Sequence, residues 1–164
     1  GHEVSHQELG RQLSMSRNTV LRYLDLLEKS FVLINVGGFS RNLRKEISKT
    51  SRYYFYDNGV RNAVIGNFNQ LSSRDDVGQL WENFLFIERM KLREYLKIRG
   101  NYYFWRTYDK KEIDLVEERG GKLFGYEFKW GSMKQKTPPK DWLENYKQAS
   151  YSVIDQDNYL KFVG

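Results

Sequence analysis

Residues 112–130 read EIDLVEERGGKLFGYEFKW, and this stretch decides the fold class of the chain. Polar and apolar side chains alternate from Glu112 to Glu117, which is the pattern of a half-buried strand. The turn signal Arg119-Gly120-Gly121 follows, and a second strand-like run extends from Lys122 to Trp130. The stretch therefore predicts two consecutive strands joined by a short turn.

The flanking sequence supplies the other parts of a sheet domain. An aromatic-rich run from Asn101 to Thr107 predicts a third strand. Upstream, apolar residues repeat at intervals of three and four from Gly78 to about Lys97, which predicts a long helix. Downstream, Asp141 to Gln148 favours a short helix and Tyr151 to Ile154 a last strand. The order of helix, three strands, helix and strand is typical of an α/β (α+β) fold with a mixed sheet.

Acidic residues in the two central strands are candidates for a site. Successive side chains of a strand point to opposite faces, so Glu112 and Asp114 are expected on one face and Ile113 and Leu115 on the other. In the following strand Glu127 shares a face with Lys129. If the two strands pair, Asp114 and Glu127 converge beside that lysine.

Two carboxylates on adjacent strands suit a hard divalent cation such as Mg²⁺. The metal would polarise a phosphodiester and lower the pKa of a bound water. Lys129 would position that water or stabilise the developing negative charge. Glu82, at the edge of the apolar stripe of the long helix, is expected to be partly buried, and it then needs a metal, hydrogen-bond donors or a cation such as Arg89 or Lys91.

Residues 5–29 favour two helices with a tight turn between them. Ser5 and Glu8 have capping-box spacing, and Ser16 can cap a second helix over residues 17–29. This layout resembles the last two helices of a winged helix-turn-helix, in which the second helix lies in the major groove of DNA. The resemblance implies nucleic-acid contacts from Arg17, Asn18 and Arg22.

A wing is predicted next, with strands at residues 31–34 and 53–56 and a turn at Gly37-Gly38. A basic loop between the strands could contact phosphates, while a winged helix used for protein contacts is the open alternative. We predict a winged helix-turn-helix over residues 1–60, whose first helix would lie upstream in a larger protein, and a second domain over residues 61–164. The basic residues of the loop are Arg41, Arg44, Lys45, Lys49 and Arg52.

Composition narrows the partners. A net charge of +6 favours a polyanion such as nucleic acid, although a basic surface without such a partner stays open. The absence of cysteine excludes a disulfide framework and a Cys-based zinc site. No apolar run is long enough to cross a bilayer, so we expect no membrane partner and a cytoplasmic location.

Asp114, followed by Glu127-Phe128-Lys129 at the end of the next strand, resembles the signature of the PD-(D/E)XK nuclease superfamily. Glu82 matches the acidic residue that many members carry on the preceding helix. The resemblance implies a restriction-endonuclease-like core, Asp114 and Glu127 as metal ligands, and Lys129 as the catalytic lysine. It also implies that Glu82 is a further ligand or orients one. The alternative is a salt-bridge network among the same four side chains.

A broader resemblance covers most of the chain. RYYFYDNGVRNAVIG at residues 52–66, GQLWENFLFIE at 78–88 and FWRTYDKKEIDLVEE at 104–118 resemble the C-terminal region of bacterial and archaeal AAA-type ATPases. In those proteins a P-loop ATPase domain precedes a winged helix and a domain of unknown function. The resemblance implies that ATP binds to an upstream domain, because this chain has no G-x-x-x-x-G-K-[ST] motif.

Three functions follow as hypotheses. The first is Mg²⁺-dependent cleavage of DNA or RNA phosphodiesters, directed by the winged helix and driven by the ATPase. The second is a non-catalytic module that anchors the ATPase to nucleic acid or to a protein partner. The third is a structural domain for protein contacts or oligomerisation, which the aromatic-rich composition supports.

Overall fold

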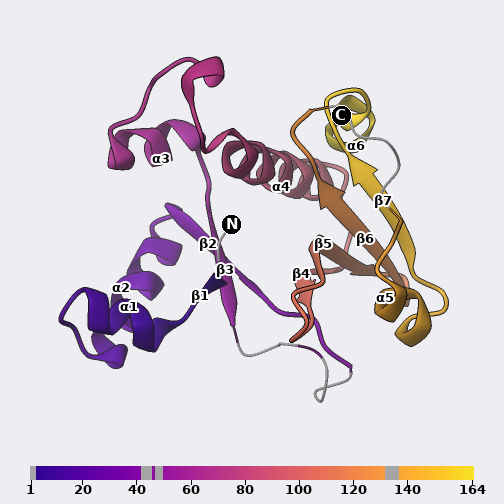
Figure 1. Ribbon diagram of the computed structural model, residues 1–164, viewed down its shortest axis with the longest axis horizontal. Helices are drawn as coiled ribbons and strands as arrows, with labels where there is room; N and C mark the ends of the chain where they lie inside the picture. Colours follow the sequence, from indigo (N-terminus) through magenta and orange to yellow (C-terminus); the bar gives the residue numbers. More distant parts are fainter. Residues whose placement is uncertain (1–2, 42–45, 47–49, 132–136) are drawn as a thin grey trace.

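The computed structural model describes residues 3–41, 46, 50–131 and 137–164, and it has the mixed α/β character that the sequence predicts (Figure 1). The described part contains two sheets, six α-helices and one short 3₁₀-helix. One sheet has three strands and the other has four. The winged-helix and nuclease-like identities of the two parts remain predictions.

The first two helices begin where the sequence predicts. Helix α1 spans His6–Gln12 and helix α2 spans Arg17–Lys29. Ser5 Oγ and Ser16 Oγ each accept the backbone N–H three residues further on, at 3.3 and 3.1 Å. Gly10 lets the helices meet closely, because a Cβ there would lie 2.7 Å from the carbonyl oxygen of Met15. Side-chain caps and one small residue thus fix the turn between α1 and α2.

The first sheet has the antiparallel order β1 (Glu3–Val4), β3 (Ser51–Phe55) and β2 (Leu33–Gly37). Helix α2 packs on this sheet through Val20, which lies in one buried cluster with Leu33. The face of α2 away from the sheet therefore remains exposed.

The connection between β2 and β3 differs from the predicted hairpin. Strand β2 runs through Gly37, and Gly38 then forms a parallel bridge with Phe104 of the second sheet. Further along, Glu46 forms an antiparallel bridge with Thr107. The prediction of a turn at Gly37-Gly38 is wrong, because Gly37 is the last residue of β2 and Gly38 bridges to the second sheet. Strand β2 also begins two residues later than predicted, after the positive φ of 55° at Phe31.

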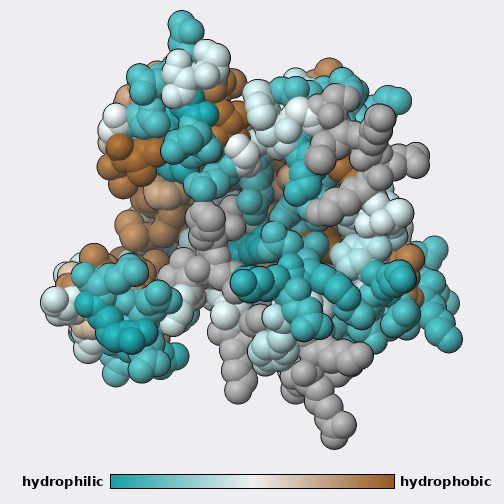
Figure 2. All heavy atoms as spheres, in the orientation of Figure 1, coloured by the Kyte–Doolittle hydropathy of each residue, from teal (hydrophilic) through white to brown (hydrophobic). Residues whose placement is uncertain are grey.

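Helix α3 spans Asn58–Ile65 and begins at Asp57, whose side chain accepts the N–H of Val60 at 2.9 Å. No side chain of α3 is buried. Its outer face is apolar, with Val64 71% exposed, and Figure 2 shows apolar atoms over this part of the surface. Exposed apolar faces of this kind mark contact sites in many proteins.

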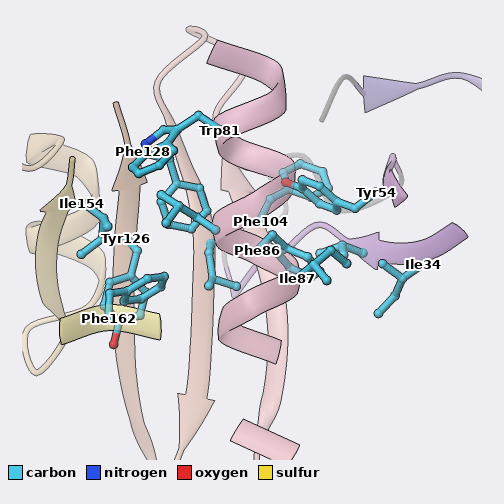
Figure 3. Packing of buried hydrophobic residues seen from close by; sticks show 13 residues of the cluster. Ile34, Tyr54, Trp81, Phe86, Ile87, Phe104, Tyr126, Phe128, Ile154 and Phe162 are labelled. Carbon is cyan, nitrogen blue, oxygen red and sulfur yellow. The ribbon is translucent and has the colours of Figure 1, made fainter. Parts of the chain in front are cut away.

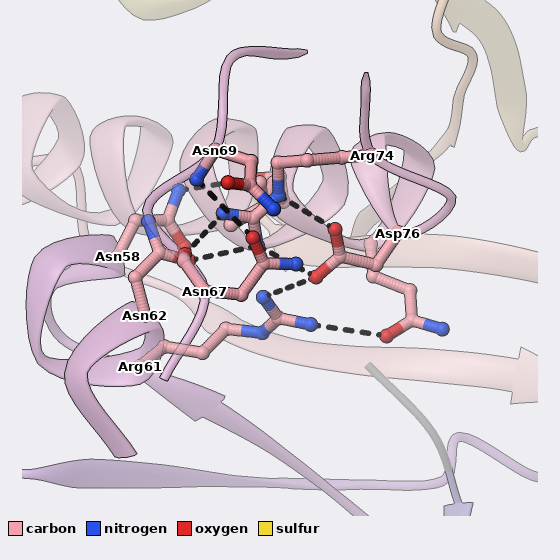
Figure 4. Close-up of polar contacts among 9 residues, drawn as sticks. Asn58, Arg61, Asn62, Asn67, Asn69, Arg74 and Asp76 are labelled. Atoms are coloured by element: carbon pink, nitrogen blue, oxygen red, sulfur yellow. Dashed lines mark hydrogen bonds and ion pairs between the residues drawn. The ribbon is translucent and has the colours of Figure 1, made fainter. Parts of the chain in front are cut away.

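After the 3₁₀-helix η1 (Leu71–Ser73), Arg74 and Asp76 form a partly buried ionic network with Arg61 of α3 (Figure 4). Both carboxylate oxygens of Asp76 accept hydrogen bonds from Arg74 at 2.8 Å, and Arg61 Nη1 reaches Asp76 Oδ2 at 2.7 Å. The hydrogen bonds from Arg74, reinforced by those from Arg61, hold the pKa of Asp76 far below its usual value. The network fixes the loop that precedes the long helix.

Replacing Asp76 with asparagine should lower the melting temperature by about 3–10 °C at pH 7, because two arginines lose a charged acceptor. A lowered folded-state pKa contributes stability above the ordinary carboxyl pKa of about 4, and this contribution is lost as the pH falls below it. The difference in melting temperature between wild type and D76N should therefore become smaller from pH 5 to pH 3, as measured by thermal melts followed by circular dichroism. The exposed neighbour variant D75N is the control, and a gap independent of pH would contradict the argument.

The second sheet and its helices follow the predicted order closely. The four strands have the order β4-β5-β6-β7, with β4–β5 and β5–β6 antiparallel and β6–β7 parallel. A helix near the C-terminus, α6, was not predicted from the sequence. The elements are α4 (Val77–Tyr95), β4 (Asn101–Arg106), β5 (Glu112–Arg119), β6 (Lys122–Phe128), α5 (Lys140–Asn145), β7 (Ser150–Ile154) and α6 (Tyr159–Val163).

Both faces of the second sheet are covered. One face packs against α4 and α6, with Phe86 and Phe162 in the same buried cluster as Leu115 of β5. The other face packs against α5 through Trp142, which is fully buried beside Ile113. Strand β5 is consequently buried over most of its length, which explains why its polar residues lie inside the protein.

The larger cluster also includes the first sheet (Figure 3). Ile34 of β2 and Tyr54 of β3 lie in one cluster with Phe86 and Ile87 of α4, and the Tyr54 and Phe86 rings stack at 4.2 Å. The division of the chain at residue 60 stays a prediction, and residues on both sides of it share this core. None of the helices in the described ranges is long and apolar enough to span a membrane.

Candidate functional site

The structure brings Asp114 and Glu127 together on neighbouring strands. The antiparallel ladder between β5 and β6 reaches Leu115 and Tyr126, so Asp114 and Glu127 come next in the register. Both are buried, with 7% and 1% of their surface exposed. Phe128 N–H donates to Asp114 Oδ2 at 2.8 Å and fixes the orientation of this carboxylate.

A β-bulge shapes this part of β5. The register between β4 and β5 shifts, so that Asp114 and Leu115 together oppose one residue of β4. Ile113 consequently packs in the cluster around Trp142, whereas Leu115 packs in the cluster under α4. The prediction that Ile113 and Leu115 share a face is wrong, because strict alternation fails at a bulge. Bulges commonly re-aim side chains beside active sites.

The electrostatics of Asp114 are those of a crowded carboxylate. Burial raises the pKa of Asp114 to about 7, with further increases from the charges of Glu82 and Glu127. The hydrogen bond from Phe128 and the charge of Arg52 act in the opposite direction. A cation close to the two strands would offset the repulsion between these carboxylates.

Lys129 lies beside Glu127, as the sequence predicts. Its Nζ is 2.7 Å from Glu127 Oε1. Burial opposes the charged form, but the hydrogen bond and charge of Glu127, together with Asp114 and Glu112, raise the pKa of Lys129 above its usual value. The side chain is therefore a protonated ammonium at neutral pH, suited to stabilising negative charge.

Glu82 lies on α4 and is partly buried, as predicted, but its partners are on another element. Tyr54 Oη donates to Glu82 Oε1 at 2.8 Å, and Arg52 Nη1 lies 3.6 Å from the same oxygen. The two cations predicted to pair with it are engaged elsewhere. Arg89 binds Glu117, and Lys91 binds Glu88.

Arg52 lies among the acidic residues, where the sequence interpretation placed it in an exposed basic loop. That interpretation is wrong, because only 4% of its side chain is exposed. Nη2 lies 2.8 Å from Glu112 Oε2, and Nη1 lies 3.5 Å from Asp114 Oδ1. The guanidinium also stacks 4.7 Å from the Phe104 ring centroid. Burial opposes its charge, but Tyr54 and the carboxylates raise the pKa of Arg52, which remains charged.

The acidic residues offer few ligands for a metal ion. Within the described ranges, no group of three or more His, Asp or Glu side chains is arranged to hold one. Two buried carboxylates, Asp114 and Glu127, remain on adjacent strands. They fit Mg²⁺, which keeps several water ligands and is commonly bound by one or two carboxylates together with substrate phosphate.

Those of the predicted nucleic-acid residues that the structure describes lie in more than one place. Arg17, Asn18 and Arg22 are exposed on α2. Arg41 instead contacts the second sheet through a 3.2 Å pair with Glu118, and its backbone N–H donates to the hydroxyl of Tyr146. Figure 1 shows α2 and these elements on different sides of the first sheet. Arg44, Lys45 and Lys49 lie outside the described residues.

Arg52 and Tyr54 were not predicted from the sequence to belong to the acidic site, and Glu112 was given no role there. Arg52 and Tyr54 are two positions apart on β3 and share its buried face. The alternation of this strand could have shown that both point inward. Glu112 was placed correctly on the same face as Asp114, and both contact Arg52.

Comparison with known proteins gives a family but no described activity. Residues 1–71 match a domain of unknown function, DUF8612. Uncharacterized proteins of Mycobacterium bovis and Mycobacterium tuberculosis are each 29% identical over 131 residues, which is 79% of this chain and 29% of theirs. An uncharacterized protein of Haemophilus influenzae is 24% identical over 121 residues, 74% of this chain and 27% of its own. The matching part is thus less than a third of each relative. No solved structure matches the chain.

The part of the chain that carries the acidic residues gives the more extensive match. Residues 77–162 include α4, the four strands of the second sheet and all four predicted catalytic positions. These residues match the domain of unknown function DUF4143 and make up more than half of the 164 residues. The chain therefore belongs to the DUF4143 family.

Proposed function

We propose that this chain is part of a longer AAA-type ATPase and that it cleaves nucleic-acid phosphodiester bonds with Mg²⁺. The observation that carries the proposal is the pair of buried carboxylates, Asp114 and Glu127, with the Lys129 ammonium 2.7 Å from one of them. Buried carboxylates with a raised pKa, such as Asp114, are enriched at functional sites. The ATPase part rests on the resemblance of residues 52–66 and 78–88, and the greater length of the relatives is compatible with it.

The order of elements supports the two fold identities within this proposal. Two capped helices followed by the β2–β3 pair are in the order of a winged helix-turn-helix, which we assign to residues 1–60. A helix, three antiparallel strands, a helix and a parallel strand are in the order of a restriction-endonuclease-like core, assigned to residues 61–164. The acidic pair lies in the two central strands of that core.

Each side chain has a defined task in the proposed reaction. Asp114 and Glu127 would hold Mg²⁺, which supplies a polarised phosphate and a bound water of lowered pKa. Lys129, protonated at neutral pH, would donate to a phosphate oxygen and stabilise the charge that develops there. Glu82, whose carboxylate accepts the Tyr54 hydroxyl, would be a further ligand or would orient one.

Calorimetric titration with Mn²⁺ tests the site directly. The wild type should bind the ion, and D114N and E127Q should both lose the binding, because each removes a carboxylate from a pair of ligands. The matched control is E118Q, on the same strand but part of an exposed pair with Arg41. If E118Q weakened Mn²⁺ binding as much as the other two variants, the effect would be one of general charge. If D114N bound Mn²⁺ as tightly as wild type, Asp114 would not be a ligand.

A second candidate function is binding of nucleic acid without cleavage. It is favoured by the exposed polar face of α2 and by the ion pairs that Arg52 makes with the acidic residues. In this case the chain would anchor the longer protein, and its affinity would fall steeply with salt as bound counterions are released.

The double variant R17A/R22A should bind DNA or RNA at least about tenfold more weakly than wild type and lower the salt slope by about two, one for each lost phosphate contact. Fluorescence anisotropy of labelled oligonucleotides between 50 and 300 mM salt, on the order used for such titrations, measures both quantities. K161Q, on the exposed part of α6, is the control. Unchanged affinity in the double variant would move the binding surface away from α2.

A further inference from the structure

Arg52 is held firmly on one side and loosely on the other. Its Nη2 makes a full hydrogen bond to Glu112, at 2.8 Å. Its Nη1 lies 3.5 Å from Asp114 Oδ1 and 3.6 Å from Glu82 Oε1, longer than the 2.7–2.9 Å or so of a strong charge-assisted bond. Its Nε is buried and makes no hydrogen bond among the described residues. The guanidinium is thus anchored at Glu112 and leans toward Asp114.

Arg52 approaches the Asp114 oxygen that does not accept the backbone N–H of Phe128. Asp114 Oδ2 already accepts the N–H of Phe128. Oδ1 is the oxygen that remains, and Arg52 Nη1 faces it. Two cations on one carboxylate oxygen repel each other strongly in a buried site. The charge of Arg52 therefore opposes a metal ion at Asp114 Oδ1.

We propose that Arg52 is a resident cation that competes with Mg²⁺ for Asp114 and thereby weakens the binding of the metal ion. This inference rests on the proposed function of the same site and adds its regulation. Three elements meet at the guanidinium: β3 carries it, β5 supplies Asp114 and Glu112, and α4 supplies Glu82. Because β3 belongs to the first sheet, a residue of the first sheet supplies the cation that faces the acidic residues of the second.

The geometry of β3 supports this role over that of a simple structural ion pair. Tyr54, two residues along, stacks on Phe86 and bonds to Glu82, so β3 is held against α4 even without Arg52. A guanidinium whose neighbour already secures the strand is not needed to attach it. Its principal effect is then on the charge of the acidic cluster.

The test is calorimetric titration of the whole chain with Mn²⁺, comparing wild type with R52Q. We expect R52Q to bind at least about tenfold more tightly, a change of 1.4 kcal/mol. Because R52Q leaves buried carboxylates without their cation, we also expect Mn²⁺ to raise its melting temperature more than that of wild type. K122Q, which removes one positive charge from the opposite end of β6, should leave the affinity unchanged.

The variant R52K guards against a failure of R52Q to fold. A lysine keeps one charge but cannot span three carboxylates, so R52K should still bind Mn²⁺ about threefold more tightly than wild type. No gain in either variant overturns the competition. If wild type binds Mn²⁺ and D114N does not, while neither Arg52 variant binds it more tightly than wild type, the inference fails and the proposed site stands. If no variant binds Mn²⁺ at all, both fail.

Discussion

The variant D114N is expected to lose Mg²⁺-dependent phosphodiester cleavage by at least about a hundredfold, an effect on the scale of removing one main electrostatic stabiliser of a transition state. The reason is geometric. The Phe128 N–H fixes the orientation of the Asp114 carboxylate beside Glu127, and an amide at this position would lose the charge that a metal ion requires. Cleavage of labelled single- and double-stranded DNA and RNA, with Mg²⁺ and with a chelator, gives the measurement.

Two further variants make this result specific to the site. E118Q changes a carboxylate on the same strand and should keep wild-type activity. The cleavage rate of K129M should also fall by about a hundredfold, because Lys129 supplies the charge that would stabilise the reacting phosphate. Cleavage that persists in D114N at the wild-type rate would show that another part of the protein, or a contaminant, carries it.

The variant E117Q is expected to destabilise the protein by about 3–5 kcal/mol, the usual cost of removing one partner from a buried ionic group. Glu117 is fully buried on β5. It accepts a 2.8 Å hydrogen bond from Arg89 Nε, and Arg119 Nε lies 3.0 Å from its other oxygen. Arg89 also donates to the carbonyl of Phe162, so this one carboxylate joins β5, α4 and α6.

Urea unfolding followed by fluorescence and circular dichroism measures this loss. The adjacent variant E118Q provides an internal comparison, because its pair with Arg41 is on the surface and contributes only about 0–1 kcal/mol. A similar small change in both variants would mean that the arginines around Glu117 find other acceptors. In that case Glu117 and its arginine partners would not be what holds the helices on the sheet.

The elements that local chemistry specifies were predicted well. Ser16 caps α2, which spans the predicted residues 17–29. The strands of the second sheet also lie within a few residues of their predicted bounds, because alternation and turn residues are visible in the sequence itself. Helix α6 has no such signal: within its five residues no side-chain cap is formed.

The features that depend on distant partners could not be predicted in the same way. Gly37-Gly38 has the composition of a turn, but its bridge to Phe104 depends on a strand more than sixty residues away. The bulge at Asp114 appears only when β4 is laid beside β5. For the same reason the contact of Glu82 with Arg52, which belongs to another sheet, could not be predicted from the spacing within its own helix.

The stacking of Tyr54 on Phe86 has an evolutionary consequence. Residues 1–71 and 77–162 match separate families, yet the two rings that meet face to face come one from each segment. Neither segment can be exchanged for an unrelated one without leaving an aromatic surface uncovered. The two segments are therefore expected to be inherited as a pair, with substitutions at Tyr54 and Phe86 occurring together across genomes.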